Sequence, residues 1–463
     1  MGDTSNKSTS RREFLKDTGR IAAASAFMAT AAPRMYAAQD NTLKVALIGC
    51  GGRGSGAAAN AMSVKRGPVK LVAMADAFED RLKSSYNNLK NDYAAKMDVP
   101  EDRRFVGFDA YKHAMDCLSP GDIAIFATPP GFRWVHFAYA VQKGLNVFME
   151  KPVTVDGPTS RRMFKLAEEA SAKNLKVGVG LMSRHSRALQ ELAKRIEDGE
   201  IGETILQRGY RMHGPIGFFS SEPKPAGISD LLYQVRRFHS FIWASGGNFS
   251  DFYIHIIDHL CWMKGAWPVK AQALGGRHYR QSPEGVTHVD QNFDTYSVEY
   301  TYPDGSKFLM DGRCIMGCKD IYSSYAHGSK AFAIVSRSGD CGQPSSIHTS
   351  QNPTDQNRVW ESRVRPDERD PYQNEWNDLV DAIRDNKPYN EAERGVRASL
   401  VTSLGRMAAH TGQEITYEEI LNCDHEMAPG LDKITMDSPA PLVSDAQGRY
   451  PVPQPGIVKN REY

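Results

Sequence analysis

Apolar runs alternate with helix-like stretches through residues 44–181. Short apolar runs bounded by glycine or polar residues indicate buried strands, and longer stretches with one apolar side indicate helices. The pattern predicts strands in KVALIG, LVAMAD, IAIFAT, NVFME and KVGVGL, and helices near 57–61, 134–143 and 158–173. Such alternation predicts a parallel sheet with crossover helices.

The order of elements changes after residue 181. The turn Pro303-Asp304-Gly305 lies between two alternating runs and predicts a hairpin, and therefore an open, largely antiparallel sheet. The predicted strands are 204–212, 269–275, 295–302 and 307–311. The predicted helices are 186–198, a long one within 245–265, 375–385, 392–411 and 416–421. Segment 214–241 is expected to be irregular, and 339–371 polar and loop-like.

These patterns divide the chain into four parts. We expect a leader at 1–38, a dinucleotide-binding domain at 41–181, an α+β domain at 182–423 and an extended, proline-rich tail at 424–463. The last helices of the third part can pack back on the nucleotide domain. The fold class is therefore α/β, with an N-terminal Rossmann domain followed by an α+β domain.

The loop after the first strand carries Gly49, Gly51 and Gly54 in the spacing GxGxxG. The first glycine makes the tight turn, the second lets backbone reach a pyrophosphate, and the third lets helix and strand pack closely. The second strand ends in Asp76, where an acid would hold the adenosine ribose hydroxyls and repel a 2′-phosphate. NAD is therefore favoured over NADP. The alternative role for Asp76 is a solvated strand end or helix cap.

The first residues have the pattern of an export signal. Arg11-Arg12 stand in a twin-arginine pattern, followed by an alanine-rich stretch at 21–32 that is too short to span a membrane stably. We expect the twin-arginine machinery to export the folded protein to the periplasm with its cofactor. The alternative is a disordered basic N-terminus. No later stretch is typical of a membrane span.

Composition excludes several other classes. Lys plus Arg number 57 against 55 Asp plus Glu, without a basic stripe, so nucleic acid is not expected as a partner. The seven cysteines form no disulfide framework, and Cys314 and Cys318 lack the second pair that a zinc site needs.

Two further motifs lie at carboxyl ends of predicted strands, where open α/β sheets bind ligands. These are Thr128-Pro129-Pro130 and Glu150-Lys151-Pro152. Together with GxGxxG and Asp76, they make the chain resemble the Gfo/Idh/MocA oxidoreductase family across nearly all of its length after the leader.

The resemblance implies roles for these residues. Lys151 would lie beside the nicotinamide and the substrate hydroxyl, and Glu150 would contact the nicotinamide ribose. A lysine beside a cationic nicotinamide should also deprotonate more easily. The family often has an amide where Met182 stands here. The expected cofactor-binding set is Gly49, Gly51, Gly52, Arg53, Gly54, Asp76, Thr128, Pro129, Trp134, His136, Glu150 and Lys151.

Asp251 and His255 stand four residues apart in SGGNFSDFYIHIIDHLCWMKG, so a helix places both on one face. The resemblance implies that His255 takes the substrate hydroxyl proton while Asp251 binds a hydroxyl or tunes the imidazole. Two alternatives are ordinary core histidines and a His-x-x-Asp-His metal helix ending at His259. The metal alternative lacks a third ligand, so no metal is expected.

Candidate substrate residues come from two places. Arg184 and His185 follow the last strand of the nucleotide domain, and Tyr233, Arg236 and Arg237 belong to the irregular segment 214–241. Rings and charged donors around a cleft suit a sugar. The alternative is a surface insertion packed against a neighbour.

These features favour an exported NAD-dependent oxidoreductase of sugars, with the family's usual homo-oligomer expected. Free NAD is scarce outside the cytoplasm, so we expect a retained cofactor and a redox-balanced reaction. Three outcomes fit: oxidation of one sugar with reduction of another, epimerisation, or glycoside hydrolysis or elimination through a transient 3-keto intermediate. A non-catalytic NAD-containing binding protein is the alternative of another class.

Overall fold

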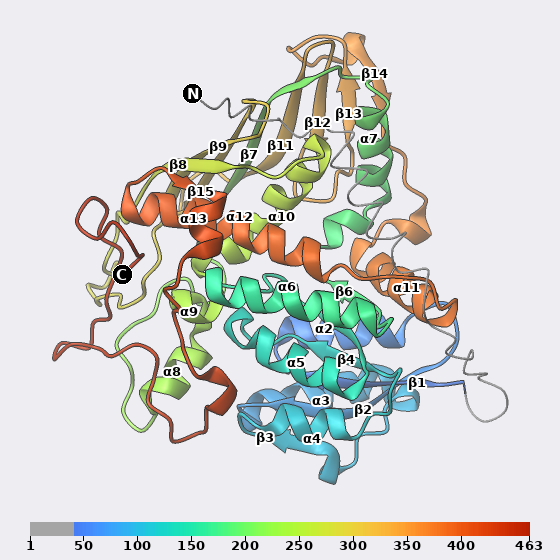
Figure 1. Cartoon of the computed structure of the whole chain (residues 1–463), viewed down its shortest axis with the longest axis vertical. Helices are drawn as coiled ribbons and strands as arrows, with labels where there is room; N and C mark the ends of the chain where they lie inside the picture. Colours follow the sequence, from blue (N-terminus) through green and yellow to red (C-terminus); the bar gives the residue numbers. More distant parts are fainter. Residues whose placement is uncertain (1–40) are drawn as a thin grey trace, which may run out of the picture.

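The computed structural model describes residues 41–463. The predicted leader, with its twin-arginine pattern, lies outside the described residues. Figure 1 shows two layers of secondary structure: an N-terminal domain of blue and cyan elements, and a second domain whose strands rise above it. Among residues 41–463, the helices lack the combination of length and apolar character needed to cross a membrane.

A six-stranded parallel sheet forms the core of the first domain, with strand order β3-β2-β1-β4-β5-β6. Its strands are β1 (Leu43–Ile48), β2 (Val69–Asp76), β3 (Arg104–Val106), β4 (Ile123–Phe126), β5 (Asn146–Met149) and β6 (Val177–Val179). Its helices are α2 (Gly52–Met62), α3 (Glu79–Tyr93), α4 (Ala110–Asp116), α5 (Arg133–Lys143) and α6 (Gly157–Ala172). The central strands are mostly apolar, and β4 is apolar throughout, because helices cover both faces of the sheet.

The second domain contains a nine-stranded sheet, with order β14-β13-β12-β11-β7-β10-β9-β8-β15. Only the β10–β7 pair is parallel among these described strands. The strands are β7 (Thr204–His213), β8 (Lys270–Gly276), β9 (Thr295–Thr301), β10 (Lys307–Cys314), β11 (Ile321–Gly328), β12 (Phe332–Ser336), β13 (Ser346–His348), β14 (Arg358–Glu361) and β15 (Ile415–Thr416). The prediction of an α/β Rossmann domain followed by an open, largely antiparallel sheet is confirmed.

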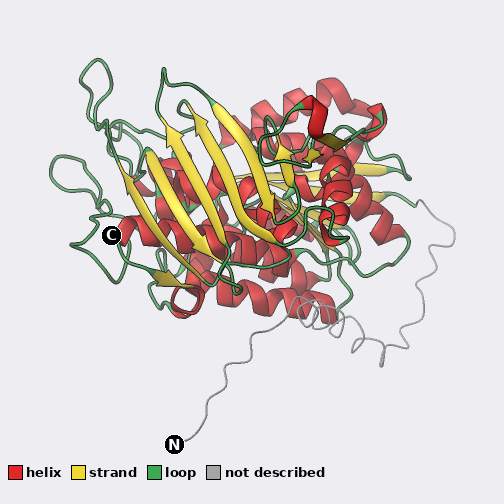
Figure 2. Cartoon of the chain, turned by 90° about the horizontal axis from the view of Figure 1, so that it is seen from above, coloured by secondary structure: helices red, strands yellow, loops and turns green. Residues whose placement is uncertain are grey.

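Helices cover one face of this sheet, and in Figure 2 the strands lie in front of them. The helices packed directly on the strands are α10 (Gly247–Lys264) and α12 (Ala392–Thr411). The other helices of this part of the chain are α7 (Arg187–Glu197), α8 (Asp230–Arg236), α9 (Ile242–Ser245), α11 (Pro371–Arg384) and α13 (Tyr417–Asn422). Helix α10 lies directly on the strands, because a β-carbon on Gly312 would come within 2.0 Å of the Tyr253 ring. Because this contact holds one side of α10 against the sheet, the opposite side of the helix faces away from it.

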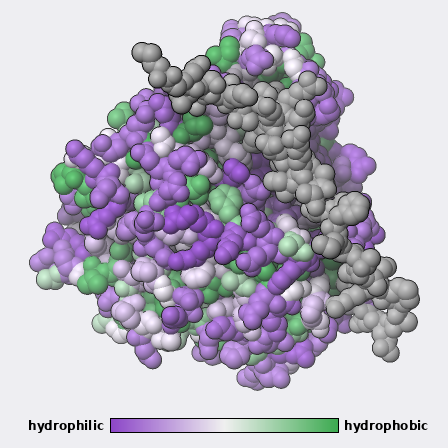
Figure 3. Space-filling model, in the orientation of Figure 1, coloured by the Kyte–Doolittle hydropathy of each residue, from purple (hydrophilic) through white to green (hydrophobic). Residues whose placement is uncertain are grey.

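Helix α11 returns to the first domain. Trp376 lies on the Phe148 ring of β5, with ring centroids 4.6 Å apart, and both side chains are buried. Residues after 423 continue as mostly irregular chain that contacts α8, where Gln234 donates to the Leu442 carbonyl at 2.8 Å. In Figure 3, hydrophilic residues predominate on the visible described surface and hydrophobic ones are scattered.

Two expectations about irregular segments are wrong. Segment 339–371 contains β13 and β14, which extend the sheet beyond β12. These strands are short, and the edge strand β14 is largely exposed, so neither has an apolar run. Segment 214–241 contains α8, which Ser229 caps by accepting from the Leu232 amide at 3.2 Å. The surrounding glycines and prolines hid this two-turn helix.

Candidate active site

The glycine loop is shaped by steric contact. Gly49 has a φ of 99°, and a β-carbon on Gly54 would lie 1.9 Å from the Gly49 carbonyl oxygen. In contrast, β-carbons on Gly51 and Gly52 would meet no atom within 4 Å. Helix α2 begins at this open space without a side-chain cap, so its first amide groups are available to an anion. The loop therefore fits a dinucleotide pyrophosphate.

Asp76 holds this loop from the end of β2. Its carboxylate accepts from the amides of Cys50 at 2.7 Å and Phe78 at 2.9 Å. Burial raises the pKa of the carboxyl group, while the two amides oppose the rise. Asp76 thus braces the glycine loop and the turn that leads into α3, and it also lines the cavity described next.

A cavity of about 670 Å³ runs from the glycine loop to the second domain. The first domain supplies the loop itself, Asp76, Thr128, Pro129 and His136. The opposite wall comes from segment 214–241, through Phe218, Val235, Phe238 and His239. The segment predicted to be irregular therefore closes the cavity.

The start of α5 supplies a neutral imidazole. His136 is buried, its Nδ1 lies 3.1 Å from the Thr128 hydroxyl, and burial lowers its pKa to about 3. Trp134, which was expected to line the same end, does not line this cavity. Its ring lies 4.5 Å from the guanidinium of Arg162 on α6. The helical rotation of α5 brings His136, and not Trp134, to the cavity.

Lys151 and Asp251 meet between the two domains. The Lys151 ammonium donates to the Asp251 backbone carbonyl at 2.6 Å and to its carboxylate at 3.1 Å. The other carboxylate oxygen lies 3.1 Å from His239 Nε2. Burial would raise the pKa of Asp251, but Lys151 and His239 hold it well below its ordinary value. Asp251 is therefore an anion between two donors.

His239 connects this pair with the cavity. Its Nδ1 accepts the Phe218 amide at 3.1 Å, so its proton is on Nε2, which faces Asp251. His239 also lines the cavity, whereas Lys151, Asp251 and His255 do not. The sequence showed His239 only as one member of a segment rich in aromatic residues and arginine.

His255 lies one turn further along α10. Burial lowers its pKa to about 4, with Asp340 opposing and Lys151 adding to the effect. Its Nδ1 lies 3.9 Å from the Asp340 carboxylate, which also accepts the Tyr322 hydroxyl. Asp340 was not predicted, because it lies in the segment interpreted as a polar loop.

Glu150 is held within the protein. Arg53 of the glycine loop donates to it at 2.9 Å from Nε and 2.5 Å from Nη2. The Arg53 guanidinium also lies 4.5 Å from the Tyr372 ring centroid. The expected contact of Glu150 with the nicotinamide ribose therefore requires this ion pair to open or to share the carboxylate.

The substrate residues predicted after β6 have internal partners. Arg184 forms two hydrogen bonds of 2.8 Å with the buried Asp258 carboxylate. His185 lies 2.7 Å from Asp378 and 3.2 Å from Glu391. Neither residue lines the cavity. Their positions indicate roles in packing the domains, and the substrate role expected for them remains a prediction.

The three predicted substrate residues of segment 214–241 are also engaged. Tyr233 is buried and donates to the Glu222 carbonyl. Arg236 pairs with Asp80 of α3 at 2.9 and 2.8 Å, and Arg237 donates to Ser221 at 2.8 Å. These contacts fold the segment and fasten it over the first domain, and the substrate role of the three residues remains a prediction.

The residues of the possible metal helix have other partners. Asp258 is bound to Arg184, and His259 Nε2 lies 2.8 Å from the Ser324 hydroxyl. Within residues 41–463, no cluster of three or more His, Cys, Asp or Glu side chains is suited to holding a metal ion.

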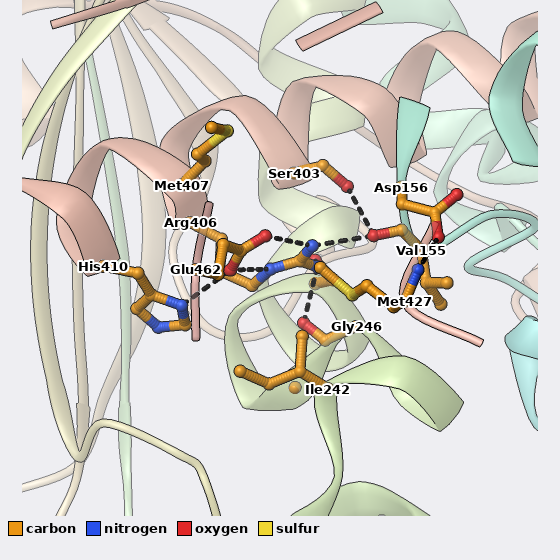
Figure 4. Close-up of polar contacts among 12 residues, drawn as sticks. Val155, Asp156, Ile242, Gly246, Ser403, Arg406, Met407, His410, Met427 and Glu462 are labelled. Carbon is orange, nitrogen blue, oxygen red and sulfur yellow. Dashed lines mark hydrogen bonds and ion pairs between the residues drawn. The ribbon is translucent and has the colours of Figure 1, made fainter. Parts of the chain in front are cut away.

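A buried ion pair lies behind the site (Figure 4). Arg406 of α12 donates to both Glu462 oxygens at 2.8 Å, and His410 Nδ1 lies 2.7 Å from the same carboxylate. The remaining Arg406 donors bind the Val155 carbonyl at 2.7 Å and the Gly246 carbonyl at 2.8 Å. Arg406 therefore joins the segment after Lys151 to the start of the helix that carries Asp251.

Comparison with known proteins identifies the first domain. Residues 43–193 match the model of the Gfo/Idh/MocA family, described as an oxidoreductase family with an NAD-binding Rossmann fold. This part of the chain is similar to the NAD-binding Rossmann domains that the model describes. The glycine loop, the uncapped start of α2 and Asp76 fit such a cofactor.

Curated relatives match over part of their length. Inositol 2-dehydrogenase of Corynebacterium glutamicum is 28% identical over 155 residues, which is 33% of this chain and 42% of that protein. The NAD(+)-dependent scyllo-inositol 2-dehydrogenase of Bacillus subtilis is 28% identical over 148 residues, 32% of this chain and 36% of that protein. The alignments thus span about two fifths of these relatives.

Solved structures match over more of the chain. Myo-inositol 2-dehydrogenase from Lactobacillus plantarum superposes with a TM-score of 0.57 at 24% identity, covering 81% of this chain and 99% of that one. Aldose-aldose oxidoreductase from Caulobacter crescentus gives 0.59 at 16% identity, with coverage of 81% and 99%. These likenesses show that the two-domain fold is shared.

Proposed function

We propose that the protein is an NAD-dependent oxidoreductase that acts on a hydroxyl-bearing carbon of a sugar or polyol. The observation that carries this proposal is the Lys151–Asp251 pair, which His239 connects with the end of the nucleotide cavity. A buried cation, a carboxylate and an imidazole from different segments can hold a hydroxyl group and move its proton. A purely nucleotide-binding protein does not need this arrangement.

The residues of the chain divide the chemistry between them. When bound, NAD supplies the acceptor for the hydride that leaves the substrate carbon. Lys151, oriented by Asp251, donates to the reacting oxygen and stabilises negative charge on it. His255, which its low pKa keeps neutral at physiological pH, takes the hydroxyl proton.

The substrate class follows from the relatives. The two curated relatives described above are named as inositol 2-dehydrogenases, and one similar structure as an aldose-aldose oxidoreductase. Inositols and cyclic aldoses share a ring that bears several hydroxyl groups, and we propose a substrate of this class for the present protein. The aromatic residues Phe218, Phe238 and Phe252 lie around His239 and suit the apolar face of such a ring.

A retained cofactor and a redox-balanced reaction are further parts of the proposal. Segment 214–241 covers the cavity, and Arg236 fastens it to Asp80 while Arg81 donates to the Arg236 carbonyl at 2.9 Å. A covered nucleotide suits export by the twin-arginine route to a compartment without free NAD. The hydride would then return to a second sugar, to the same carbon in epimerisation, or to a 3-keto intermediate during glycoside hydrolysis or elimination.

The test is to purify the protein without added nucleotide and identify any bound nucleotide by mass. Inositols and aldoses are then added while NADH absorbance and products are followed. We expect bound NAD and a spectral change or turnover with at least one substrate. Lys151→Met should abolish the response, while Lys194→Met, at an exposed lysine on α7, should leave it unchanged.

Two results would contradict parts of this proposal. Absence of bound nucleotide, together with no response to any sugar or polyol when NAD is supplied, would favour a binding protein. Normal turnover by Lys151→Met would show that the reaction occurs elsewhere.

A further inference from the structure

Asp340 lies in the turn that follows β12, far in sequence from the other groups of the site. Its side chain is only 14% exposed. One carboxylate oxygen accepts the Tyr322 hydroxyl and lies 3.9 Å from His255 Nδ1, and the other lies 3.2 Å from the Cys341 sulfur. Within the described chain, His255 Nδ1 is buried and has no hydrogen-bond partner. A carboxylate thus faces an unsatisfied imidazole nitrogen.

This arrangement assigns different tasks to the two ring nitrogens. A movement of about 1 Å would bring Nδ1 and the carboxylate within hydrogen-bond distance. An Nδ1–H group donated to Asp340 leaves Nε2 unprotonated, so that Nε2 is the atom able to take a proton from substrate. A carboxylate that orients an imidazole in this way also stabilises the imidazolium formed during reaction.

Asp340 is itself held in an ionised and fixed state. Burial would raise its pKa, but His255 and Tyr322 hold it below its ordinary value. Burial and Asp340 raise the pKa of Tyr322, which therefore remains a hydroxyl donor. The Arg211 guanidinium covers the Tyr322 ring at 3.7 Å from its centroid. The Asp340 carboxylate is thus held in place by the side chains around it.

Other charged groups face His255 from each neighbouring element. Lys151 and Glu150 come from the segment after β5, Arg211 from β7 and His259 from α10 itself. Lys151 and Arg211 disfavour the protonated ring, whereas Asp340 is the largest influence that favours it. Removing the Asp340 charge should therefore weaken His255 as a base.

We propose that Asp340, held by Tyr322, is a positioning residue that orients His255 and supports its protonation during the reaction. This inference rests on the proposed function, in which His255 takes the substrate proton. Asp340, in the turn after β12, would add a carboxylate from the second domain to a site otherwise formed by α10, segment 214–241 and the end of β5.

The experiment compares wild type with Asp340→Asn, Asp340→Ala and Tyr322→Phe. We expect kcat to fall roughly tenfold to a hundredfold in Asp340→Ala, less in Asp340→Asn and least in Tyr322→Phe, with KM and NAD affinity changing by less than about threefold. The acid limb of the kcat–pH profile should move to lower pH in both Asp340 variants. Asp424→Asn, at a carboxylate that is 95% exposed, is the matched control.

A second measurement separates this inference from the proposed function. NMR titration of the His255 ring, assigned by its loss in His255→Gln, should show a lower pKa in both Asp340 variants even if no substrate is known. An unchanged His255 pKa, or an unchanged kcat in an active enzyme, would overturn the inference. A fall in kcat that comes with a lower melting temperature, and with no other change, would also overturn the inference. Failure of wild type to turn over any substrate, with the NMR shift present, would count against the proposed function alone.

Discussion

The two ends of the cavity are built in different ways. The nucleotide end is formed mainly by one continuous loop, in which Gly49 and Gly54 pack against backbone and Gly51 and Gly52 leave space. The site proposed for catalysis, which His239 joins to the other end, is assembled from distant segments: Lys151 after β5, His239 from segment 214–241, and Asp251 on α10. The nucleotide end depends on the absence of side chains, whereas the other depends on buried charged groups that form ion pairs with one another.

This difference predicts different responses to substitution. At the nucleotide end, an added methyl group should act through steric overlap, and its effect should appear in stability and NAD affinity. At the site proposed for catalysis, loss of one charge should leave its partners unpaired, and its effect should appear chiefly in kcat and much less in NAD affinity. The following variants test this contrast.

Asp251→Asn should have the largest effect. The substitution keeps the shape of the side chain but removes the anion between Lys151 and His239, so we expect kcat to fall by roughly 10²–10⁴-fold. NAD affinity, measured by fluorescence titration, should change by less than about threefold. The exposed carboxylate of Asp355 provides the control Asp355→Asn. A large loss of NAD affinity in Asp251→Asn would show that the two ends are not separate.

Arg184→Met should destabilise the protein by about 3–5 kcal/mol, because it leaves the fully buried Asp258 carboxylate without its partner. Chemical denaturation measures the change. Arg195→Met, at a half-exposed arginine on α7, should cost about 1 kcal/mol or less. If Arg184→Met instead keeps its stability and raises KM strongly, the substrate role expected from the sequence is correct.

Gly54→Ala should cost about 1–3 kcal/mol in stability and weaken NAD binding, since the new methyl group would overlap the Gly49 carbonyl. Gly52→Ala is the matched variant, because its methyl group enters open space. It should fold normally, and any loss of NAD affinity in it reports how closely the nucleotide approaches. Equal stability losses in the two variants would contradict the steric account.

Arg236→Ala should have the smallest effect on stability, about 0.2–1 kcal/mol, because its pair with Asp80 is partly exposed. We expect NAD to dissociate several-fold faster, since this pair fastens segment 214–241 over the cavity. Stopped-flow displacement measures the rate, with Arg449→Ala as an exposed control. An unchanged dissociation rate would remove the argument for a retained cofactor.

The fold of the first domain could be read from the sequence because its signals are local. Strands such as Ile123–Phe126 are buried on both sides and therefore apolar throughout, and the GxGxxG spacing lies within one loop. The missed strands β13 and β14 had no such signal, unlike the missed strand β12, whose residues are all buried. Strand Ser346–His348 has three residues, and strand Arg358–Glu361 lies at the exposed sheet edge.

Residues of the candidate site could be predicted only where the residue type suited the chemistry and its position in a predicted helix or strand suited a binding site. The spacing of Asp251 and His255 placed them on one helix face, but the family resemblance suggested their roles and that of Lys151, and these roles remain predictions. Arg184 was named as a substrate residue from its place after the last strand of the nucleotide domain, and the sequence did not show its partner Asp258, which lies 74 residues away. A charged residue within an apolar helix, as Asp258 is, signals that a buried partner exists. Asp340 offered no comparable signal.

The Arg406–Glu462 pair has a consequence for biosynthesis. During translation, Arg406 is synthesised 56 residues before Glu462, whose carboxylate neutralises it. Until then a guanidinium destined for the interior lacks its counter-charge, and the segments that carry Lys151 and Asp251 lack the tie between them. The tie between these two segments therefore depends on Glu462, which is synthesised after both of them.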